Sequence, residues 1–192
     1  MAEDVPDKRA AIMKAALIMF TQRGFHGTPT SMISKSAGVS TGILFRYFET
    51  KNDLINSVYF SAKERMGQAT YAGCEQEKSV RNKIRRIWGN AIRWGAENPY
   101  EFLFVEQFSS SPFITDVTRE EALKNFSLLF EVLNEGISTG TLKNQDRGLA
   151  LEMLYSANVA VVKKLIQSGD PKDIDETIDK SFDIVWSGIA RK

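Results

Sequence analysis

Two glycines divide the stretch from Ile12 to Leu54 into three short apolar segments, and this division constrains the fold more than any other feature. Before Gly24, apolar residues recur at the three- and four-residue spacing of a helix face, at Ile12, Ala15, Ala16, Met19 and Phe20. Glycine ends helices readily because it adopts the left-handed conformation without a steric penalty. The pattern predicts a helix that ends at Gly24 and is followed by two shorter helices.

The second glycine, Gly38, lies in the turn between the two shorter segments. Thr28-Pro29-Thr30-Ser31 offers hydroxyl caps and a proline, which are start signals for the first of them. Ser40 can cap the second. The apolar residues that can hold this second helix on the core are Ile43, Leu44 and Phe48. Two short helices joined by a sharp turn and supported by a third form a helix-turn-helix unit, which typically places its last helix in the major groove of DNA.

The same stretch is basic. Between Lys8 and Lys51 there are seven lysines and arginines and a single acid, Glu49, so this window carries a net charge of +6. Because the whole chain carries +1, the remainder carries −5. A basic segment joined to a mildly acidic body suits phosphate binding. A solvated charged face without a partner is the alternative, and the helix-turn-helix spacing favours DNA over it.

Three motifs in this region resemble the DNA-binding signature of the TetR (tetracycline repressor) family. They are Gly24-Phe25-His26-Gly27-Thr28, Ala37-Gly38-Val39-Ser40-Thr41-Gly42 and Leu44-Phe45-Arg46-Tyr47-Phe48, with Lys51 and Leu54 following. The match covers roughly the first quarter of the chain, and it is specific because many residue types and spacings agree together. The resemblance implies an all-α protein with an N-terminal helix-turn-helix DNA-binding domain, residues 1–52, and a helical ligand-binding and dimerisation domain, residues 53–192. It also implies a bacterial repressor that a small molecule releases from a palindromic operator.

The candidate DNA contacts follow from this arrangement. Hydroxyl groups at the two helix starts can cap a helix and also bind a phosphate of the DNA backbone, at Thr28, Thr30, Ser31 and Ser40. Thr41 and Gly42 are candidates for base edges, and Gly42 has no side chain to hold the backbone away from the groove. Arg46 can bind guanine or clamp a phosphate, and its place late in a short helix slightly favours the phosphate.

The family resemblance makes Tyr47 and Lys51 phosphate clamps, although Tyr47 could also be a core aromatic with its hydroxyl at the surface. Phe45 departs from the family, in which a tyrosine is common at this position. Phenylalanine cannot donate a hydrogen bond, which leaves a thymine methyl group or a sugar as its contact. His26, the single histidine, is interpreted as structural or solvent-facing. One histidine and one cysteine make a metal site improbable, and no cofactor is expected.

Beyond residue 53 the spacing of apolar residues is helical, without an internal repeat or a convincing strand. Helices are expected from Asp53 to about Thr70, from Val80 to Asn98, over 100–108, from Thr118 to Gly140, over 149–166 and over 174–189. The helix over 149–166 is apolar on more than one face, so it is either central or covered by a partner. We therefore expect a homodimer through the last two helices, with completion of a monomer core as the alternative.

The body is rich in aromatic residues. The candidates for lining a ligand cavity are Trp88, Phe102, Phe108, Phe126, Phe130 and Tyr155, and plain core packing is the alternative for each. Trp88 lies on the inner stripe, whereas Trp94 lies about 240° further round the same helix and faces elsewhere. The scarcity of charge among these residues predicts an apolar or aromatic ligand.

Other functions receive less support from the sequence. An all-α enzyme or carrier and a nonspecific architectural DNA-binding protein are the alternatives, but no catalytic constellation supports an enzyme. No apolar run approaches the roughly 18 residues of a membrane span. The acidic N-terminal residues lack the apolar core of a secretory signal, and Cys74 has no partner for an internal disulfide. These features favour the cytoplasm and no membrane association.

Overall fold

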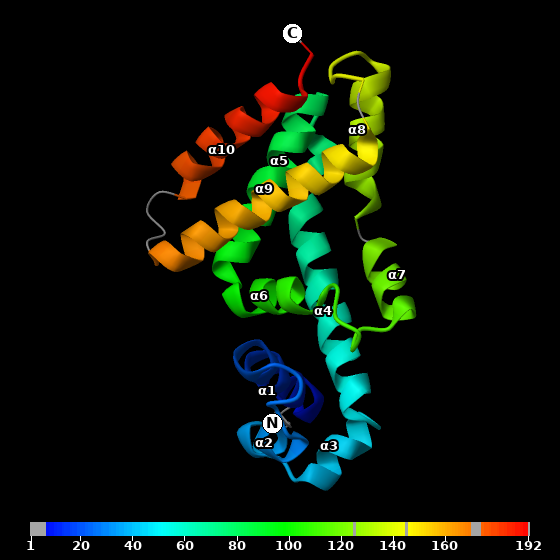
Figure 1. The fold of residues 1–192 in the computed structure, drawn as a ribbon, viewed down its shortest axis with the longest axis vertical. Coiled ribbons are helices and arrows are strands. Elements are labelled where there is room, and N and C mark those ends of the chain that lie inside the picture. The colour runs from blue at the N-terminus through cyan, green and yellow to red at the C-terminus, as the bar shows by residue number, and fades with distance from the viewer. Residues whose placement is uncertain (1–6, 125, 145, 170–173, 192) are drawn as a thin grey trace, which may run out of the picture. The chain divides into compact units, whose positions relative to one another are not determined.

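The computed structural model describes residues 7–124, 126–144, 146–169 and 174–191, which are predominantly helical (Figure 1). The first helices are α1 (Lys8–Arg23), α2 (Thr30–Ser36), α3 (Thr41–Tyr47) and α4 (Lys51–Tyr71). They are followed by the 3-10 turn η1 (Cys74–Gln76), α5 (Val80–Glu97), α6 (Pro99–Phe108), α7 (Asp116–Lys124), α8 (Ser127–Ser138), α9 (Arg147–Ser168) and α10 (Ile174–Ile189). The β-type pairing in the described residues is an isolated bridge between Leu142 and Ala190. The all-α fold expected from the sequence is confirmed.

Contacts between helices group the chain into two compact units. The first comprises the residues up to Lys63 together with Tyr100–Ala122, and the second comprises Glu64–Pro99 together with Leu123–Lys192. Helix α4 is continuous through Lys63, where one unit gives way to the other. The sequence motifs did not indicate that α6 would pack with the N-terminal helices. The domain boundary at residue 52, which follows from the family resemblance, stays a prediction.

Aromatic rings form the centre of the first unit. Phe20 of α1 is fully buried, and its ring centroid lies 6.4 Å from those of both Phe104 and Phe108 of α6. The rings of Phe104 and Phe108 are 4.8 Å apart. Burying three such rings removes a large apolar area from water, which holds α6 against α1.

The loop after α6 is fixed to α4 and to the turn after α1. The side-chain amide of Asn56 donates to the Phe113 carbonyl at 2.9 Å, and its oxygen accepts the Thr115 backbone N–H at 2.9 Å. The ring of Phe113 stacks on that of Phe25, with 4.0 Å between centroids. Since Phe25 belongs to the turn that follows α1, these contacts join the loop, α4 and the turn.

Helix α5 is the centre of the second unit, where it packs against α8, α9 and α10 (Figure 1). Gly89 lets α10 approach closely, because a Cβ atom at this position would lie 3.3 Å from Ile178. Arginines of α5 pair with aspartates of α10 in antiparallel order, as Arg81–Asp183, Arg85–Asp179 and Arg93–Asp175. These side chains are largely exposed, so the pairs contribute to the register of the two helices more than to stability.

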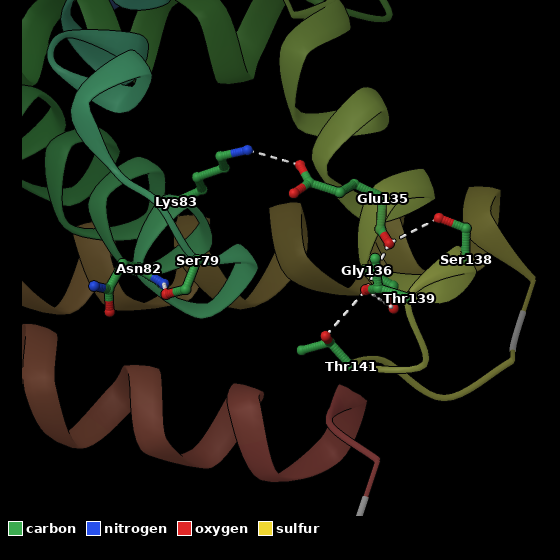
Figure 2. A network of polar contacts seen from close by, with 8 residues as sticks. All are labelled: Ser79, Asn82, Lys83, Glu135, Gly136, Ser138, Thr139 and Thr141. Carbon is green, nitrogen blue, oxygen red and sulfur yellow. Dashed lines mark hydrogen bonds and ion pairs between the residues drawn. The ribbon is translucent and has the colours of Figure 1, made fainter.

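A polar network joins the start of α5 to the end of α8 (Figure 2). Lys83 donates to the carboxylate of Glu135 at 2.7 Å. The Ser79 hydroxyl caps α5 by accepting the Asn82 backbone N–H at 3.2 Å, and the Thr139 hydroxyl donates to the Glu135 carbonyl at 2.9 Å. The network therefore closes both helix ends with side-chain hydrogen bonds.

One expected helix is two helices in the structure. The single helix predicted from Thr118 to Gly140 was wrong, because α7 ends at Lys124 and α8 begins at Ser127. Phe126 has φ −118° and ψ 11°, outside the helical range, and its backbone N–H donates at 2.9 Å to the Leu123 carbonyl, three residues earlier instead of four. The cap of α7 is Thr115, whose hydroxyl oxygen accepts the Thr118 backbone N–H at 3.2 Å. Asp170, Pro171 and Asp173 are residue types that commonly begin a helix, and they lie outside the described residues.

Candidate nucleic-acid interface and apolar cavity

Helix α3 exposes one face and anchors the other. Leu44 and Phe48 are buried, and Ser40 caps the helix by accepting the Ile43 backbone N–H at 3.2 Å. The exposed residues of α3 are Gly42, Phe45, Arg46 and Tyr47. A helix held in this way can enter a groove without any change in its own packing.

Two large aromatic side chains extend into solvent from α3. Phe45 is 44% exposed and Tyr47 is 45% exposed. Leaving two rings in water forgoes hydrophobic free energy, so an aromatic pair beside Arg46 indicates a surface that a partner covers. A phenylalanine ring suits a thymine methyl group or a sugar, and a tyrosine hydroxyl suits a phosphate oxygen.

The glycine at position 42 is not required by the fold. A Cβ atom there would meet only the Ser40 hydroxyl within 4 Å, at 3.9 Å. Gly24 and Gly38 differ, because their φ angles of 70° and 68° lie in the left-handed region that the helix end and the interhelical turn require. Gly42 therefore leaves free space on the outward face of α3.

The start of α2 is capped differently from the prediction. Pro29 occupies the N-cap position, and no side-chain hydroxyl caps the helix. Thr30 is half-buried and Ser31 is exposed in the first turn of α2. The Thr41 hydroxyl lies 3.1 Å from that of the buried Ser34, at the junction of α2 and α3. The structure thus brings Thr30, Ser31 and Thr41 to the two helices of the helix-turn-helix, as the sequence predicted.

Thr28 is fully buried, unlike its neighbours. Its hydroxyl donates to the carbonyls of Gly24 at 2.8 Å and Met19 at 3.1 Å. This side chain secures the turn after α1, and it could reach a phosphate only if the turn opened. The sequence did not separate Thr28 from Thr30, because both are threonines beside the same proline.

Lys51 begins α4 and points back to the turn after α1. Its ammonium group donates to the Phe25 carbonyl and lies 4.2 Å from the centroid of the Phe25 ring. Partial burial lowers the pKa of Lys51. A hydrogen bond and a cation–π contact therefore hold Lys51 against Phe25, and a phosphate would compete with both.

Lys63 is a buried cation that the sequence analysis missed. Burial lowers the pKa of Lys63 to about 8, and the nearby carboxylate of Glu106 opposes this effect. Its position four residues after the buried Tyr59 on α4 is the signal that could have identified it, since residues at that spacing share a helix face. Burial therefore disfavours the charged form of Lys63, and the carboxylate of Glu106 offsets part of that cost.

The second unit contains a cavity of about 80 Å³ between side chains of α4, α5, α8 and α9, together with Phe126. Three of the six residues expected to line a ligand cavity do line it: Trp88, Phe126 and Tyr155. The other three lie elsewhere. Phe102 and Phe108 are buried in the first unit, and Phe130 is exposed on α8. Helical periodicity marks a buried face without showing which neighbour that face meets.

The cavity wall is apolar. The indole N–H of Trp88 donates to the Ser181 hydroxyl at 3.0 Å, and the Tyr71 hydroxyl donates to the Phe126 carbonyl. Burial raises the pKa of Tyr71. Among the lining residues that the structure describes, none carries a charge. A cavity of this composition suits an uncharged apolar group.

Two further features are absent from the described ranges. No three histidine, cysteine, aspartate or glutamate side chains there are placed to hold a metal ion. None of the helices described combines the length and the apolar composition that crossing a bilayer requires.

Residues 12–58 match the family model described as "Bacterial regulatory proteins, tetR family". The chain is 24% identical to the fatty acid metabolism regulator protein of Bacillus subtilis (strain 168), with 96% of this chain and 97% of that protein covered. Its fold matches a TetR family transcription regulator from Marinobacter aquaeolei VT8 with a TM-score of 0.88, at 24% identity and with 100% of both chains covered. It also matches the Bacillus subtilis transcriptional regulator FadR, solved in complex with stearoyl-CoA, with a TM-score of 0.77, at 22% identity and with 94% and 98% covered.

Proposed function

We propose that this chain, which belongs to the TetR family of bacterial transcriptional regulators, is a dimeric repressor that a small apolar ligand releases from a palindromic operator. The observation that carries the proposal is the outward face of α3, where two aromatic rings and an arginine are exposed on a helix anchored from behind. The proteins that the chain resembles are transcription regulators and not enzymes. A DNA operator implies the cytoplasm of a bacterium as its location.

In this proposal, the residues of α3 read the operator. Thr41, Gly42 and Phe45 lie against base edges, and Arg46 and Tyr47 bind phosphates on either side of the groove. The hydroxyls of Thr30, Ser31 and Ser40 add phosphate contacts at the two helix starts. Thr28 and Lys51 would join them only after their present hydrogen bonds within the protein break.

Exposed apolar side chains on the last two helices support a dimer. Leu149 and Met153 of α9 and Ile184 of α10 are largely in solvent. Leaving large apolar side chains in solvent forgoes hydrophobic free energy, which a partner would recover. A second copy is the occupant that we propose, because a two-fold axis would present two α3 helices to two half-sites.

The cavity of the second unit is the proposed effector site. Its apolar wall supports an apolar ligand, and so do the fatty acid regulator and the stearoyl-CoA complex among the similar proteins. Helix α4 contributes to the cavity wall and continues into the first unit. A ligand that binds better to one orientation of α4 would change the separation of the two readers and so lower operator affinity.

Selection of genomic fragments with the purified full-length protein tests this function. We expect bound fragments to share two half-sites related by a dyad, and a footprint on the selected DNA to cover both. An architectural protein would protect fragments without a common palindrome, and that outcome would refute the proposal. A screen of apolar compounds against the selected operator then tests release, and failure of every compound to weaken binding would contradict the effector mechanism.

A further inference from the structure

Thr70 of α4 contains a buried oxygen without a hydrogen-bond partner. The residue is 4% exposed, and its Oγ1 is buried without a hydrogen-bond partner. No other buried side-chain nitrogen or oxygen in the described part of the chain lacks a partner. Folded proteins pair nearly all such groups, because a buried hydroxyl that has lost water without gaining a partner destabilises the fold. The exception at Thr70 therefore needs a reason.

A threonine in a helix has a simple way to satisfy its hydroxyl, which is to donate to the carbonyl four residues earlier. Thr21 of α1 does so, with 2.8 Å between its Oγ1 and the Leu17 carbonyl oxygen. Thr70 makes no such bond, and it lines the apolar cavity of the second unit. Its hydroxyl is thus left without a partner at the wall of a cavity.

Other polar groups around the cavity are already engaged. The Tyr71 hydroxyl donates to the Phe126 carbonyl, the Trp88 indole donates to Ser181, and the Asn158 amide donates to the Trp88 carbonyl at 3.2 Å. A buried water needs two to four polar partners, which a wall of this composition does not readily supply. A ligand that brings its own polar atom is the better partner for Thr70.

We propose that Thr70 hydrogen-bonds the effector, and that the effector is a neutral, largely apolar molecule carrying a hydroxyl or carbonyl oxygen. The inference rests on the proposed effector site in the same cavity. A charged group would be buried there without a counter-charge, which is costly. A pure hydrocarbon would leave the hydroxyl unpaired, and sites with a buried polar group discriminate against ligands that lack its partner.

The size of the cavity adds one requirement. Its volume of about 80 Å³ is smaller than the ~150 Å³ of an engineered apolar cavity that binds benzene. A ligand with a six-membered ring must therefore widen it. Met66 lies on the wall, and methionine adapts easily because its side chain is unbranched and flexible.

Matched probe pairs test the assignment on the full-length protein. p-Cresol and p-xylene differ by hydroxyl against methyl, as do cyclohexanol and methylcyclohexane. Binding of each is measured by calorimetry and by tryptophan fluorescence, to which Trp88 on the cavity wall contributes. We expect Thr70→Val to lower the affinity ratio of p-cresol to p-xylene by about tenfold, which is the contribution of one neutral hydrogen bond. Thr70→Ser, which keeps the hydroxyl, should preserve the ratio.

Thermal stability without ligand gives a second readout. Thr70→Val should raise the Tm of the free protein, because an unpaired hydroxyl is replaced by a methyl group of similar size. Thr21→Val is the matched control, and it should lower the Tm because it removes a hydroxyl that is bonded, without affecting the probe ratio. A higher Tm of Thr70→Val combined with a lower selectivity for the hydroxylated probe is not expected of a residue that only packs.

Three outcomes would overturn the assignment. They are an affinity ratio that Thr70→Val leaves unchanged, a Tm that falls in this variant, and a wild-type protein that binds neither hydroxylated probe. In each case, release of the operator by another compound that binds in the cavity would still support the proposed function. Failure of the Thr70 assignment is therefore distinguishable from failure of the proposed function.

Discussion

At the scale of single residues, the structure separates side chains of the same type by what surrounds them. Thr28 faces inward while Ser31 is in solvent, although both stand near the start of α2. Arg46 is exposed on α3, whereas the ammonium of Lys51 is held at the Phe25 turn. These surroundings decide which cations are available to a phosphate and which already have a partner.

Arg46→Ala should weaken operator binding and lower the dependence of log K on log salt by about one unit, because one phosphate contact is lost. Stability should not change, since the side chain is exposed. Titrations over a series of salt concentrations measure the slope. Lys78→Ala removes an exposed cation before α5 and should leave the slope unchanged. A change in base preference with an unaltered slope would show that Arg46 reads a base instead.

Lys51→Met should destabilise the protein by about 1 kcal/mol, because it removes both a cation–π contact and a hydrogen bond to the Phe25 carbonyl. Urea unfolding followed by circular dichroism measures this loss. The salt slope of operator binding should stay unchanged if Lys51 keeps its present partner in the complex. A drop of about one unit would show that Lys51 leaves Phe25 for a phosphate.

Lys63 should make stability depend on pH in the alkaline range. Its pKa is lowered to about 8 in the folded protein, against about 10.4 in an unfolded chain. Between these values the unfolded state binds more protons, so the free energy of unfolding should rise with pH from about 8 to about 10, while the full cost of the charge remains below pH 8.

Lys63→Met should therefore stabilise the protein at pH 7 by about 1–3 kcal/mol. It should also abolish the part of the pH-dependent rise in the free energy of unfolding that Lys63 contributes. Denaturant unfolding of the wild type and the variant at several pH values checks it, with the exposed Lys78→Met as the control. Parallel pH profiles for the wild type and Lys63→Met would contradict the assignment.

At the scale of helices, glycine and hydroxyl groups decide where elements end and how closely they pack. A Cβ atom at Gly136 of α8 would lie 2.5 Å from Leu142 and 2.9 Å from Val80 of α5. The close packing of α8 on α5 beside the network of Figure 2 therefore depends on glycine at this position. Gly188 of α10 is different, because nothing lies within 4 Å of a Cβ atom there.

Gly136→Ala should destabilise the protein by about 1–3 kcal/mol, which is the usual cost of overpacking a core. Gly188→Ala should have no effect or stabilise slightly, because alanine is the better helix former and meets open space. Thermal unfolding of the two variants side by side measures the difference. Equal Tm changes would mean that α8 shifts freely away from α5.

At the scale of the whole molecule, the exposed apolar side chains of the last two helices bear on whether the protein is a monomer or a dimer. Ile184 of α10 is 73% exposed, whereas Phe182 on the same helix is buried in its own chain. A charge at Phe182 would therefore unfold the protein and would not test assembly. Val117 of α7 is 72% exposed and lies outside the last two helices, so it provides a matched control.

Ile184→Glu should convert a dimer into a folded monomer at micromolar concentration, because a buried charge without a partner opposes association. Light scattering after size exclusion measures the mass, and circular dichroism confirms the fold. Val117→Glu should remain dimeric. A wild-type protein that is monomeric under the same conditions would contradict the proposed dimer.

Local sequence was sufficient for the helix-turn-helix. The spacing of Ile12 to Phe20, the left-handed glycines 24 and 38, and the Ser40 cap act within a few residues of one another, so each is visible in the chain itself. The exposed face of α3 follows directly, because burying Leu44 and Phe48 turns the intervening residues outward. The bounds of α5 and α10 were also predicted closely, since their apolar spacing is uninterrupted.

Contacts between distant residues decided the rest. The Tyr71 hydroxyl donates to the Phe126 carbonyl at the break between α7 and α8. The periodicity does not show this break, because the apolar spacing continues from α7 into α8. Lys51 finds its partner at Phe25, and the rings of α6 join α1 instead of the cavity. Even the unpaired hydroxyl of Thr70 exists only because packing removes water from it without supplying a partner. A sequence lists donors, acceptors and rings, whereas only the tertiary structure determines which of them meet.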